Sequence, residues 1–344
     1  MISIYGFTLL RNGIKYDYSF KESLTSLLSI TKSTFLALGD SEDETEKSLL
    51  DLNLNIRRTL WDDSLKEGAI ILSQQTNIAL DFLRESHGQD EKAWGIYLQC
   101  DEVFHEDDYQ LIKKDLQKAH DLGCDAMTFR YLHFWKDHHS LAINKKWYPH
   151  EIRAIKIKTN ICSWGDAQSF QNYSKLYHSE ARVFHYGHVR EEESYKKKKK
   201  DILTLYHPDN LMKKYRRREK RFDDLTECIP YFGTHPEVMR QRIEKMGDTW
   251  ILDQVEDAHI LGRESHFSPE LVSRIHAKRV HFYSTISDAP RFIRSELVIV
   301  APHFFQRLWV RSFVPLKMRS KLARVWSFEF VLTLKLSERG ITLK

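Results

Sequence analysis

The sequence predicts an α/β protein with a mostly parallel sheet flanked by helices, and three observations support this fold class. Strand-like and helix-like segments alternate through the first half of the 344-residue chain. Hydrophobic residues make up 42% of the composition, which is enough to form a sizeable core. One apolar strand runs directly into two carboxylates, Asp101 and Glu102. Because open α/β sheets bind ligands at the carboxyl ends of their strands, this pair indicates a cation and phosphate site, with a solvated acidic turn as the alternative.

The first elements follow from the spacing of their apolar residues. Ile2–Leu10 has the pattern of a strand, and Phe20–Ile30 carries its leucines at helical spacing. Thr34–Gly39 is a short apolar run of the kind found in buried strands, and Glu44–Leu52 is helical in spacing after a turn of small and acidic residues. Asn55–Leu60 is then expected to form the next strand.

The alternation continues through the middle of the chain. Gln75–Arg84 is expected to be a helix, Ala93–Leu98 a strand, and Tyr109–Leu122 an amphipathic helix with its apolar residues on one side. Ala126–Phe134 and Glu151–Lys158 have the composition of strands. Because repeated strand and helix units form crossover connections, these segments predict a mostly parallel sheet.

The pattern changes after Val189, where the chain becomes basic and mainly helical in its spacing. We therefore expect an α/β domain over residues 1–190. A helical, basic C-terminal region over residues 191–344 would face an acceptor or a membrane.

Positive charge is concentrated in two places, although the net charge is only +5. The block from Tyr195 to Arg221 contains the run Lys196–Lys200 and attracts anions. Near the C-terminus, arginines and lysines alternate with aromatic residues between Phe304 and Trp326. This second pattern suits an amphipathic helix that lies either on an anionic membrane surface or against the core of the protein itself.

The four cysteines are widely spaced and form no CxxC pair, so we expect free thiols in a reducing compartment and no zinc bound by sulfur. The chain has no secretory signal pattern at its start and no run of 18 or more apolar residues. We expect a cytoplasmic protein, either soluble or peripheral at the inner face of the plasma membrane.

Four motifs occur in order along the first part of the chain. They are GFTLLRNGIKYDYSFKESLTSLL, LALGDSEDETEK, QQTNIAL and WGIYLQCDEVFHEDD. With these motifs, residues 1–190 resemble a GT-A (Rossmann-like) glycosyltransferase, in particular the inverting group called glycosyltransferase family 2, of bacterial surface-glycan type. The resemblance implies transfer of a hexosyl or related sugar from a nucleotide-sugar donor to a surface polysaccharide or lipopolysaccharide-type acceptor.

The resemblance also implies a metal site, in which Mg²⁺ or Mn²⁺ neutralises the donor diphosphate as the glycosidic bond breaks. Asp101 stands at the position that usually ligates the metal, and His185, in the segment ARVFHYGHVR, would complete the site. Gln99 stands where the family usually has a first acid, and it would bind a ribose hydroxyl instead. Glu102 is either a compensating ligand or a solvated turn residue. His185 has the alternative role of a hydrogen-bonded core histidine.

Nucleotide-binding residues are carried over from the same resemblance. The acidic turn supplies Asp40 or Asp43, of which Asp43 fits the spacing better, and both have helix N-capping as the alternative. Phe7 and Asn12 would line the same crevice, with strand-end packing and a turn as their alternative. Asn77 matches the asparagine on the helix that precedes the acidic motif.

Inversion requires a base that takes the proton of the acceptor hydroxyl, and Asp166 in CSWGDAQSF is our candidate. Its alternatives are an acceptor-binding residue and a helix cap. His188 and Arg190 would contact the diphosphate, although Arg190 could instead pair with the glutamates that follow it. In a narrower bacterial subgroup that the chain also resembles, aromatic and basic residues face the substrate, but they could equally belong to the core. They are Tyr131, His133, Trp135, Arg153 and His235.

Three other classes were weighed against this interpretation. A nucleotidyltransferase would normally open with a Gly-rich phosphate loop, and none follows Ile2–Leu10. A nucleic-acid-binding protein could use the basic residues 195–221, but the chain has no zinc-finger spacing or RNP-type motif. A non-catalytic GT-A-like binding module is the third alternative, because Gln99 replaces an acid. The expected partners are therefore a nucleotide-sugar donor, a glycan or glycolipid acceptor and an anionic membrane surface, and nucleic acid is not expected.

Overall fold

The computed structural model describes residues 2–62, 64–65, 69–142, 147–191, 193–195, 198, 201, 216–217, 228–231, 234–248, 280–282 and 297–299. The chain divides into two compact units. The first contains residues Met1–Tyr131, His150–Asp224 and Pro236–Gln241, and the second contains Leu132–Pro149, Leu225–His235 and Arg242–Lys344. The predicted division at residue 190 stays a prediction.

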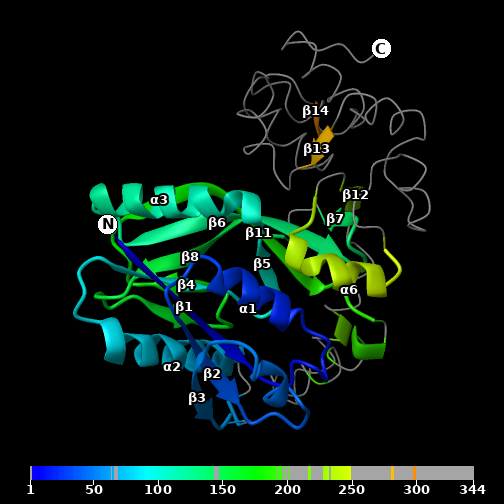
Figure 1. Ribbon diagram of the computed structural model, residues 1–344, viewed down its shortest axis with the longest axis horizontal. Coiled ribbons are helices and arrows are strands. Elements are labelled where there is room, and N and C mark those ends of the chain that lie inside the picture. Colours follow the sequence, from blue (N-terminus) through cyan, green and yellow to red (C-terminus); the bar gives the residue numbers. More distant parts are fainter. Residues whose placement is uncertain are drawn as a thin grey trace. The chain divides into compact units, whose positions relative to one another are not determined.

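The first unit is built on a sheet whose N-terminal strands are parallel, which confirms the predicted fold class (Figure 1). β1 (Ser3–Leu10) pairs in parallel with both β2 (Thr34–Gly39) and β4 (Ala93–Tyr97), and β2 pairs in parallel with β3 (Asn55–Thr59). The strand order is β3-β2-β1-β4. Beyond β4 the pairing is antiparallel, first with β8 (His150–Lys156) and then with β6 (Ala126–Trp135).

Side chains alternate across β2, and this alternation places a helix on each face of the sheet. Phe35 and Ala37 belong to the core that α2 (Ile70–His87) covers, together with Leu80 and Leu83 of that helix. Leu36 and Leu38 belong to a second core, which contains Leu24 of α1 (Phe20–Leu28). The two helices therefore connect β1 to β2 and β3 to β4 across opposite faces, as right-handed crossovers require.

Shorter elements complete this unit. β5 (Glu102–Phe104) pairs antiparallel with the long strand β11 (Leu176–His188), which places Glu102 opposite His185. The turn η3 (Glu106–Asp108) leads into α3 (Tyr109–Asp121), and Figure 1 shows α3 and α2 on opposite sides of the strands. β9 (Cys162–Trp164) and β10 (Ser169–Gln171) form a small hairpin of their own.

The helix expected over Glu44–Leu52 is wrong, because only the 3₁₀ turn η1 (Lys47–Leu49) forms there. Of the leucines in this stretch, Leu49 is buried whereas Leu50 is 81% exposed. Leu49 and the partly buried Leu52 are the leucines of this segment that pack against the core. Two such contacts give little stability to a longer helix.

In the second unit, β7 (Ser140–Ala142) pairs antiparallel with β12 (Cys228–Pro230) and with the end of β6, where Leu141 lies opposite Phe134. A short parallel pair, β13 (Val280–Phe282) and β14 (Leu297–Ile299), follows later in the chain. The turn η5 (Glu237–Met239) and the helix α6 (Arg240–Lys245) lie between these segments in sequence.

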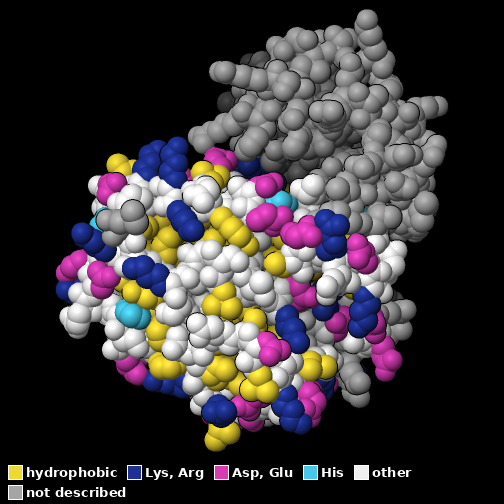
Figure 2. Space-filling model, in the orientation of Figure 1, with side chains coloured by type: hydrophobic (Ala, Val, Ile, Leu, Met, Phe, Trp, Pro, Cys, Tyr) yellow, Lys and Arg dark blue, Asp and Glu magenta, His cyan; other side chains and the backbone are white. Residues whose placement is uncertain are grey.

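Most of the region expected to be helical and basic lies outside the described residues. This is true of the amphipathic pattern between Phe304 and Trp326 and of all but a few residues in the block from Tyr195 to Arg221. In the part of the chain that is described, no helix is long and apolar enough to cross a membrane. On the face shown in Figure 2, basic and acidic side chains are interspersed.

Candidate functional site

A pocket of about 190 Å³ lies at the carboxyl ends of β1 and β4 in the first unit. After β1 the chain moves to one side of that strand to form β2 and β3. It then returns to the other side of β1, where it forms β4. Such a switch in strand order separates the connecting loops and leaves a crevice where α/β proteins bind ligands. The pocket is lined by Leu9, Leu10, Arg11, Asn12, Tyr16, Tyr18, Trp61, Leu72, Tyr97, Gln99, Cys100, Asp101 and Lys198.

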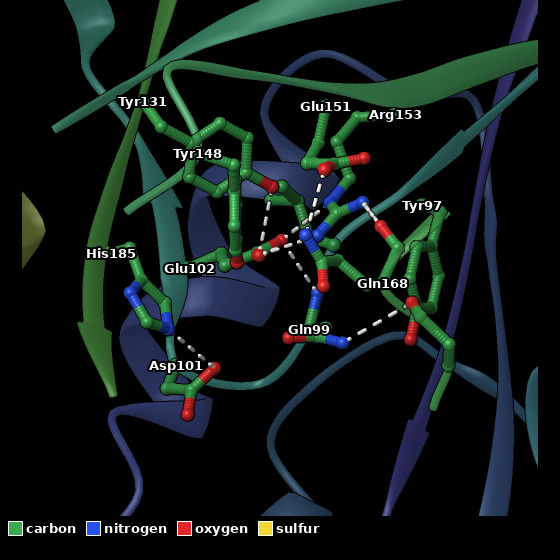
Figure 3. Close-up of polar contacts among 12 residues, drawn as sticks. Tyr97, Gln99, Asp101, Glu102, Tyr131, Tyr148, Glu151, Arg153, Gln168 and His185 are labelled. Atoms are coloured by element: carbon green, nitrogen blue, oxygen red, sulfur yellow. Dashed lines mark hydrogen bonds and ion pairs between the residues drawn. The ribbon is translucent and has the colours of Figure 1, made fainter. Parts of the chain in front are cut away.

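The carboxylate of Asp101 is surrounded by nitrogen atoms. Lys198 Nζ lies 3.6 Å and Arg190 Nη2 lies 3.9 Å from Asp101 Oδ2, and His185 Nε2 lies 3.9 Å from Oδ1. β4 delivers Asp101 at its carboxyl end, β11 delivers His185, and the chain after β11 delivers the two cationic side chains. Figure 3 shows Asp101 and His185 facing each other.

Burial and charge act in opposite directions on these groups. Burial alone would raise the pKa of Asp101, but the positive charges of Lys198, His185 and Arg190 outweigh it and hold that pKa below its usual value. Burial lowers the pKa of His185 despite the nearby carboxylates, which act in the opposite direction. Burial, together with the charge of Arg190, lowers the pKa of Lys198 to about 7.

The close approach of His185 and Asp101 depends on Gly187. A Cβ added at this glycine would lie 2.5 Å from His185 Nε2 and 2.8 Å from Asp101 Oδ2, both well inside contact distance. Residues 185 and 187 therefore lie on one face of β11, as the alternation of side chains along a strand requires. Any larger residue at position 187 would push the imidazole and the carboxylate out of place.

Tyr18 packs against both cationic side chains. Its ring centroid lies 4.5 Å from Lys198 Nζ and 5.0 Å from the guanidinium carbon of Arg190. Arg190 also donates hydrogen bonds to the carbonyl oxygens of Tyr16, at 2.6 Å, and of Gly187. The hydroxyl of Tyr16 donates to Asp201 Oδ2 at 2.9 Å. Arg190, Lys198 and Asp201 are thus attached to the loop after β1.

The predicted nucleotide residues divide into those that line the pocket and those that shape it. Asn12 lines the pocket, and its left-handed backbone (φ 53°) and its side chain, which accepts from Glu42 N at 2.7 Å, fix the loop after β1. Asp43 accepts from the backbone nitrogens of Lys15, at 2.6 Å, and of Thr45, at 3.0 Å. Its carboxylate is thus used to fix the loops around it, and it caps no helix, because η1 begins at Lys47 with Glu46 as its N-cap.

Asp40 and Phe7 lie around the pocket without lining it. Asp40 accepts a hydrogen bond from Trp61 N at 3.2 Å and pairs with Arg11, and both of these partners are lining residues. Phe7 is fully buried between the rings of Tyr97 and Phe170, as strand packing predicts.

Gln99 and Asn77 position the hairpin that carries Asp166. Gln99 lines the pocket and donates from Nε2 to the carbonyl of Ala167 at 3.3 Å. Asn77 on α2 donates to Ser163 O at 2.9 Å and accepts from Ser163 N at 2.8 Å. Asp166 lies in the turn between β9 and β10, exposed to solvent and one residue before Ala167.

Glu102 does not face the pocket. Its two carboxylate oxygens accept from Nη2 and Nε of Arg153, each at 2.8 Å, and one of them also accepts from the hydroxyl of Tyr131 at 2.8 Å (Figure 3). Glu102 and Arg153 are both completely buried. Both roles considered for Glu102, compensating ligand and solvated turn residue, are therefore wrong, and Arg153 and Tyr131 serve the interior instead of facing a substrate.

The remaining aromatic and histidine residues of that set are also buried. His133 lies beside Tyr148 and Trp147, and its Nε2 lies 2.8 Å from the carbonyl oxygen of Tyr148. Trp135 contacts Trp147, and His235 contacts several aromatic rings of the second unit. His188, near the end of β11, lies 6.0 Å from His185 between ring centroids.

Of the residues that line the pocket, sequence reasoning named only Asn12, Gln99 and Asp101 as site residues. Lys198, Tyr18 and Trp61 are among those that it missed. Lys198 is one of five consecutive lysines, so nothing in the sequence separates it from its neighbours. Trp61 lies over Gly39, where any side chain would collide with its indole. The sequence could not predict this contact, because Gly39 and Trp61 belong to different elements that only the fold brings together.

Among the described residues, no three His, Cys, Asp or Glu side chains gather in an arrangement that could hold a metal ion. Asp101 and His185 are the pair available at the pocket. The described cysteines Cys100, Cys124 and Cys162 are free thiols, as expected. Burial raises the pKa of Cys100 to about 12, so its thiol is neutral and unsuited to bind a metal.

No protein-family model matches the sequence, and no curated protein matches it. Solved structures give only remote similarities. A TarS 1–349 chain from S. aureus in complex with UDP has a TM-score of 0.35 and 12% identity, over 98% of this chain and 92% of that one. The full TarS structure has a TM-score of 0.35 and 11% identity, over 59% of this chain and 39% of that chain's length. A putative glucose-1-phosphate thymidylyltransferase from Bacillus anthracis has a TM-score of 0.29 and 12% identity, over 59% of this chain and 82% of that one.

Proposed function

We propose that this chain is a transferase that binds a nucleotide sugar in the pocket and passes the sugar, with inversion, to a surface polysaccharide or lipopolysaccharide-type acceptor. One observation carries the proposal: a pocket at the switch in strand order ends in a buried carboxylate that two cationic side chains and an imidazole surround. Such a pocket combines apolar walls for a nucleoside with concentrated positive charge for its phosphates. The resemblance of the four N-terminal motifs to GT-A enzymes agrees with this assignment.

The lining residues suggest how the donor would lie. Tyr18, Trp61 and Leu72 offer apolar and aromatic surface to a nucleoside, and Asn12 and Gln99 offer amide groups to its base or ribose. The diphosphate would then lie toward Lys198 and Asp101. In this orientation the sugar lies near Gln99 and the turn that carries Asp166.

The reaction proposed is a single displacement. The acceptor hydroxyl oxygen forms a bond to the anomeric carbon while the bond from that carbon to the diphosphate oxygen breaks, and the nucleoside diphosphate leaves with the electron pair. Asp166 would take the hydroxyl proton. Its exposed position in the β9–β10 turn would let it reach an acceptor that arrives from solvent.

A divalent cation would have Asp101 and His185 as its protein ligands and would neutralise charge on the diphosphate. This donor set fits such an ion poorly, because the same carboxylate already faces Lys198 and Arg190 and because Gln99 adds no negative charge. The expected Mg²⁺ or Mn²⁺ therefore stays a prediction, and no step of the reaction is derived through it. Peripheral binding at the inner face of the plasma membrane stays a prediction too, since the segment that would bind lies outside the described residues.

Ligand-induced stabilisation tests the donor site. We expect one class among UDP-, GDP-, CMP- and dTDP-sugars to raise the melting temperature, since a ligand at ~100 times its Kd adds about 2.7 kcal/mol. Leu72→Trp places a larger side chain in the pocket and should abolish the shift. Ile70→Trp is the matched control, because Ile70 lies on the same helix, is 48% exposed and does not line the pocket.

Absence of any shift with the unmodified chain, or an undiminished shift in Leu72→Trp, would contradict the donor site. Turnover is then tested by release of the nucleoside diphosphate in the presence of glycan acceptors. Donor binding without turnover for any acceptor would favour the non-catalytic binding module. Retention of RNA with a steep dependence on salt would favour the nucleic-acid-binding alternative.

A further inference from the structure

We propose that Lys198, supported by Arg190, supplies the positive charge that neutralises the diphosphate of the donor, in the place where a divalent cation would otherwise stand. This inference rests on the proposed function and deepens it, since it concerns how the same pocket holds its ligand. It would make donor binding independent of metal ions.

The first argument is the position of Lys198. This residue lines the pocket, and its Nζ lies 3.6 Å from Asp101 Oδ2, which is beyond a normal hydrogen bond. The ammonium group thus shares the pocket with Asp101 without being tightly paired to it. An ammonium group carries three donors on a flexible stem, so it can turn toward an anionic oxygen in the pocket.

The second argument is the formal charge at this end of the pocket. When Lys198 is protonated, it and Arg190 carry two positive charges against the one negative charge of Asp101, and a bound diphosphate favours this protonated form. The neighbouring Glu102 is fully paired with Arg153. This surplus of positive charge attracts a diphosphate and repels a metal cation.

The third argument is that the cationic groups are held in place without being neutralised. Tyr18 offers its ring to both, at 4.5 Å from Lys198 Nζ and 5.0 Å from the Arg190 guanidinium. A cation–π contact stabilises a cation but adds no opposing formal charge. Arg190 is further fixed by the carbonyls of Tyr16 and Gly187, so it adds charge from behind Asp101 without moving.

The chemistry requires no further reactant. As the bond between the anomeric carbon and the diphosphate oxygen breaks, the electron pair passes to that oxygen. Lys198 donates hydrogen bonds to the diphosphate oxygens and stabilises the charge that develops on them. The proton of the acceptor hydroxyl goes to the base, so Lys198 keeps its own protons.

Calorimetric titration of the full chain with UDP and with GDP tests the inference. Each titration is made in EDTA and again in excess Mn²⁺. We expect equal affinity in the two buffers for whichever nucleotide binds. Lys198→Gln should weaken binding by about 10- to 100-fold, as expected for loss of hydrogen bonds from a charged donor, and Lys198→Arg should retain most of the affinity. Lys158→Gln is the matched control, because Lys158 is an exposed lysine that pairs with Glu91 away from the pocket.

Asp101→Asn separates the two models of the site. If Lys198 provides the charge, removal of the Asp101 carboxylate leaves binding intact or tightens it, whereas a metal held by Asp101 would be lost together with the nucleotide. Binding that requires Mn²⁺, or that fails in Asp101→Asn but persists in Lys198→Gln, overturns the inference and leaves the proposed function standing. If the unmodified chain binds neither UDP nor GDP, in EDTA or in Mn²⁺, the inference is overturned as well. The thermal-shift screen with nucleotide sugars then decides whether the proposed function survives.

Discussion

Asp101 and Glu102 are adjacent in the chain, yet they meet opposite environments. Asp101 turns toward the pocket and keeps only loose contacts with the nitrogen atoms around it. Glu102 begins β5 and turns into the interior, where Arg153 binds both of its oxygens. Asp101 lies in the turn that is closed by the hydrogen bond from Glu102 N to Gln99 O, whereas Glu102 is the first residue of a strand. The pair of acids therefore divides into one residue for the site and one for the core.

The buried pair predicts a large loss of stability when one partner is removed. Glu102→Gln leaves the guanidinium of Arg153 buried without its counter-charge, so we expect a loss of about 3 to 5 kcal/mol in the free energy of unfolding. Urea denaturation measures this loss. Glu91→Gln is the control, because Glu91 pairs with Lys158 on the surface and is 76% exposed, and its loss should be no more than ~1 kcal/mol. Equal losses in the two variants would contradict the structural role of Glu102.

At the level of residues, the sequence predicted position better than role. Asp101, Asn12 and Gln99 were placed at strand ends, and all three line the pocket. Asp43 was chosen for the nucleotide, but its carboxylate binds the backbone of its own and a neighbouring loop. The position of Asp101 follows from hydrophobic spacing, which is local, and those of Asn12 and Gln99 from the resemblance to a known family. The role of a carboxylate depends on which donors the tertiary fold brings to it.

At the level of elements, the hairpin β9–β10 is attached to the sheet domain by Phe170 in the core, by a hydrogen bond from Arg153 to the carbonyl of Gln168, and by side chains of α2. Asn77 on α2 satisfies both the N–H and the carbonyl of Ser163, as a neighbouring strand would. Arg84, further along the same helix, donates to the carbonyls of Thr159 and Ile161 just before the hairpin. The turn that carries Asp166 is thus positioned by side chains of α2.

Asn77→Ala should loosen this hairpin without unfolding the domain. Two hydrogen bonds are removed, which corresponds to about 1 to 3 kcal/mol of local stability. We expect faster amide hydrogen exchange in residues 162–171, measured by mass spectrometry, and little change in β1 or β4. Gln89→Ala, at an exposed amide after the same helix, should leave exchange unchanged. Unaltered exchange in Asn77→Ala would show that other contacts hold the hairpin.

Some elements were predicted with close bounds because their hydrophobic patterns are strong, although α2 (Ile70–His87) extends beyond both ends of the expected Gln75–Arg84. Thr34–Gly39 forms a strand with the expected bounds, and α3 differs from its expected range by one residue. The three-residue strands β5, β9 and β10 were not predicted. A strand of this length has no periodicity to detect, and its existence depends on a partner that is distant in sequence.

At the level of the whole molecule, buried acidic groups predict sensitivity to alkali. Burial raises the pKa of Cys100 from 9.0 to about 12 and that of Tyr16 from 10.0 to about 12. Above about pH 9 the unfolded chain releases these protons while the folded chain keeps them, so the free energy of unfolding falls as the pH rises toward 12.

Urea denaturation at several values between about pH 8 and about pH 11 measures this fall, which approaches ~1.4 kcal/mol per pH unit for each proton that the two states hold differently. Cys100→Ala removes one of the two groups and should give a shallower slope, even if it is less stable at neutral pH. An identical slope in the variant would contradict the assigned burial of the thiol.

The acids of the site and of the buried pair are synthesised before their cationic partners, so the two sets of charges meet only late in translation. Glu102 is translated 51 residues before Arg153, and Asp101 is translated before Arg190 and Lys198. At ~5 to 20 residues per second, the acid of the buried pair waits about 3 to 10 s for its partner to be synthesised. Strands β1 to β4, and the acids Asp101 and Glu102 that follow them, must therefore leave the ribosome before the cationic partners of these acids. The interior and the pocket can close only after synthesis has passed Arg153 and then Lys198.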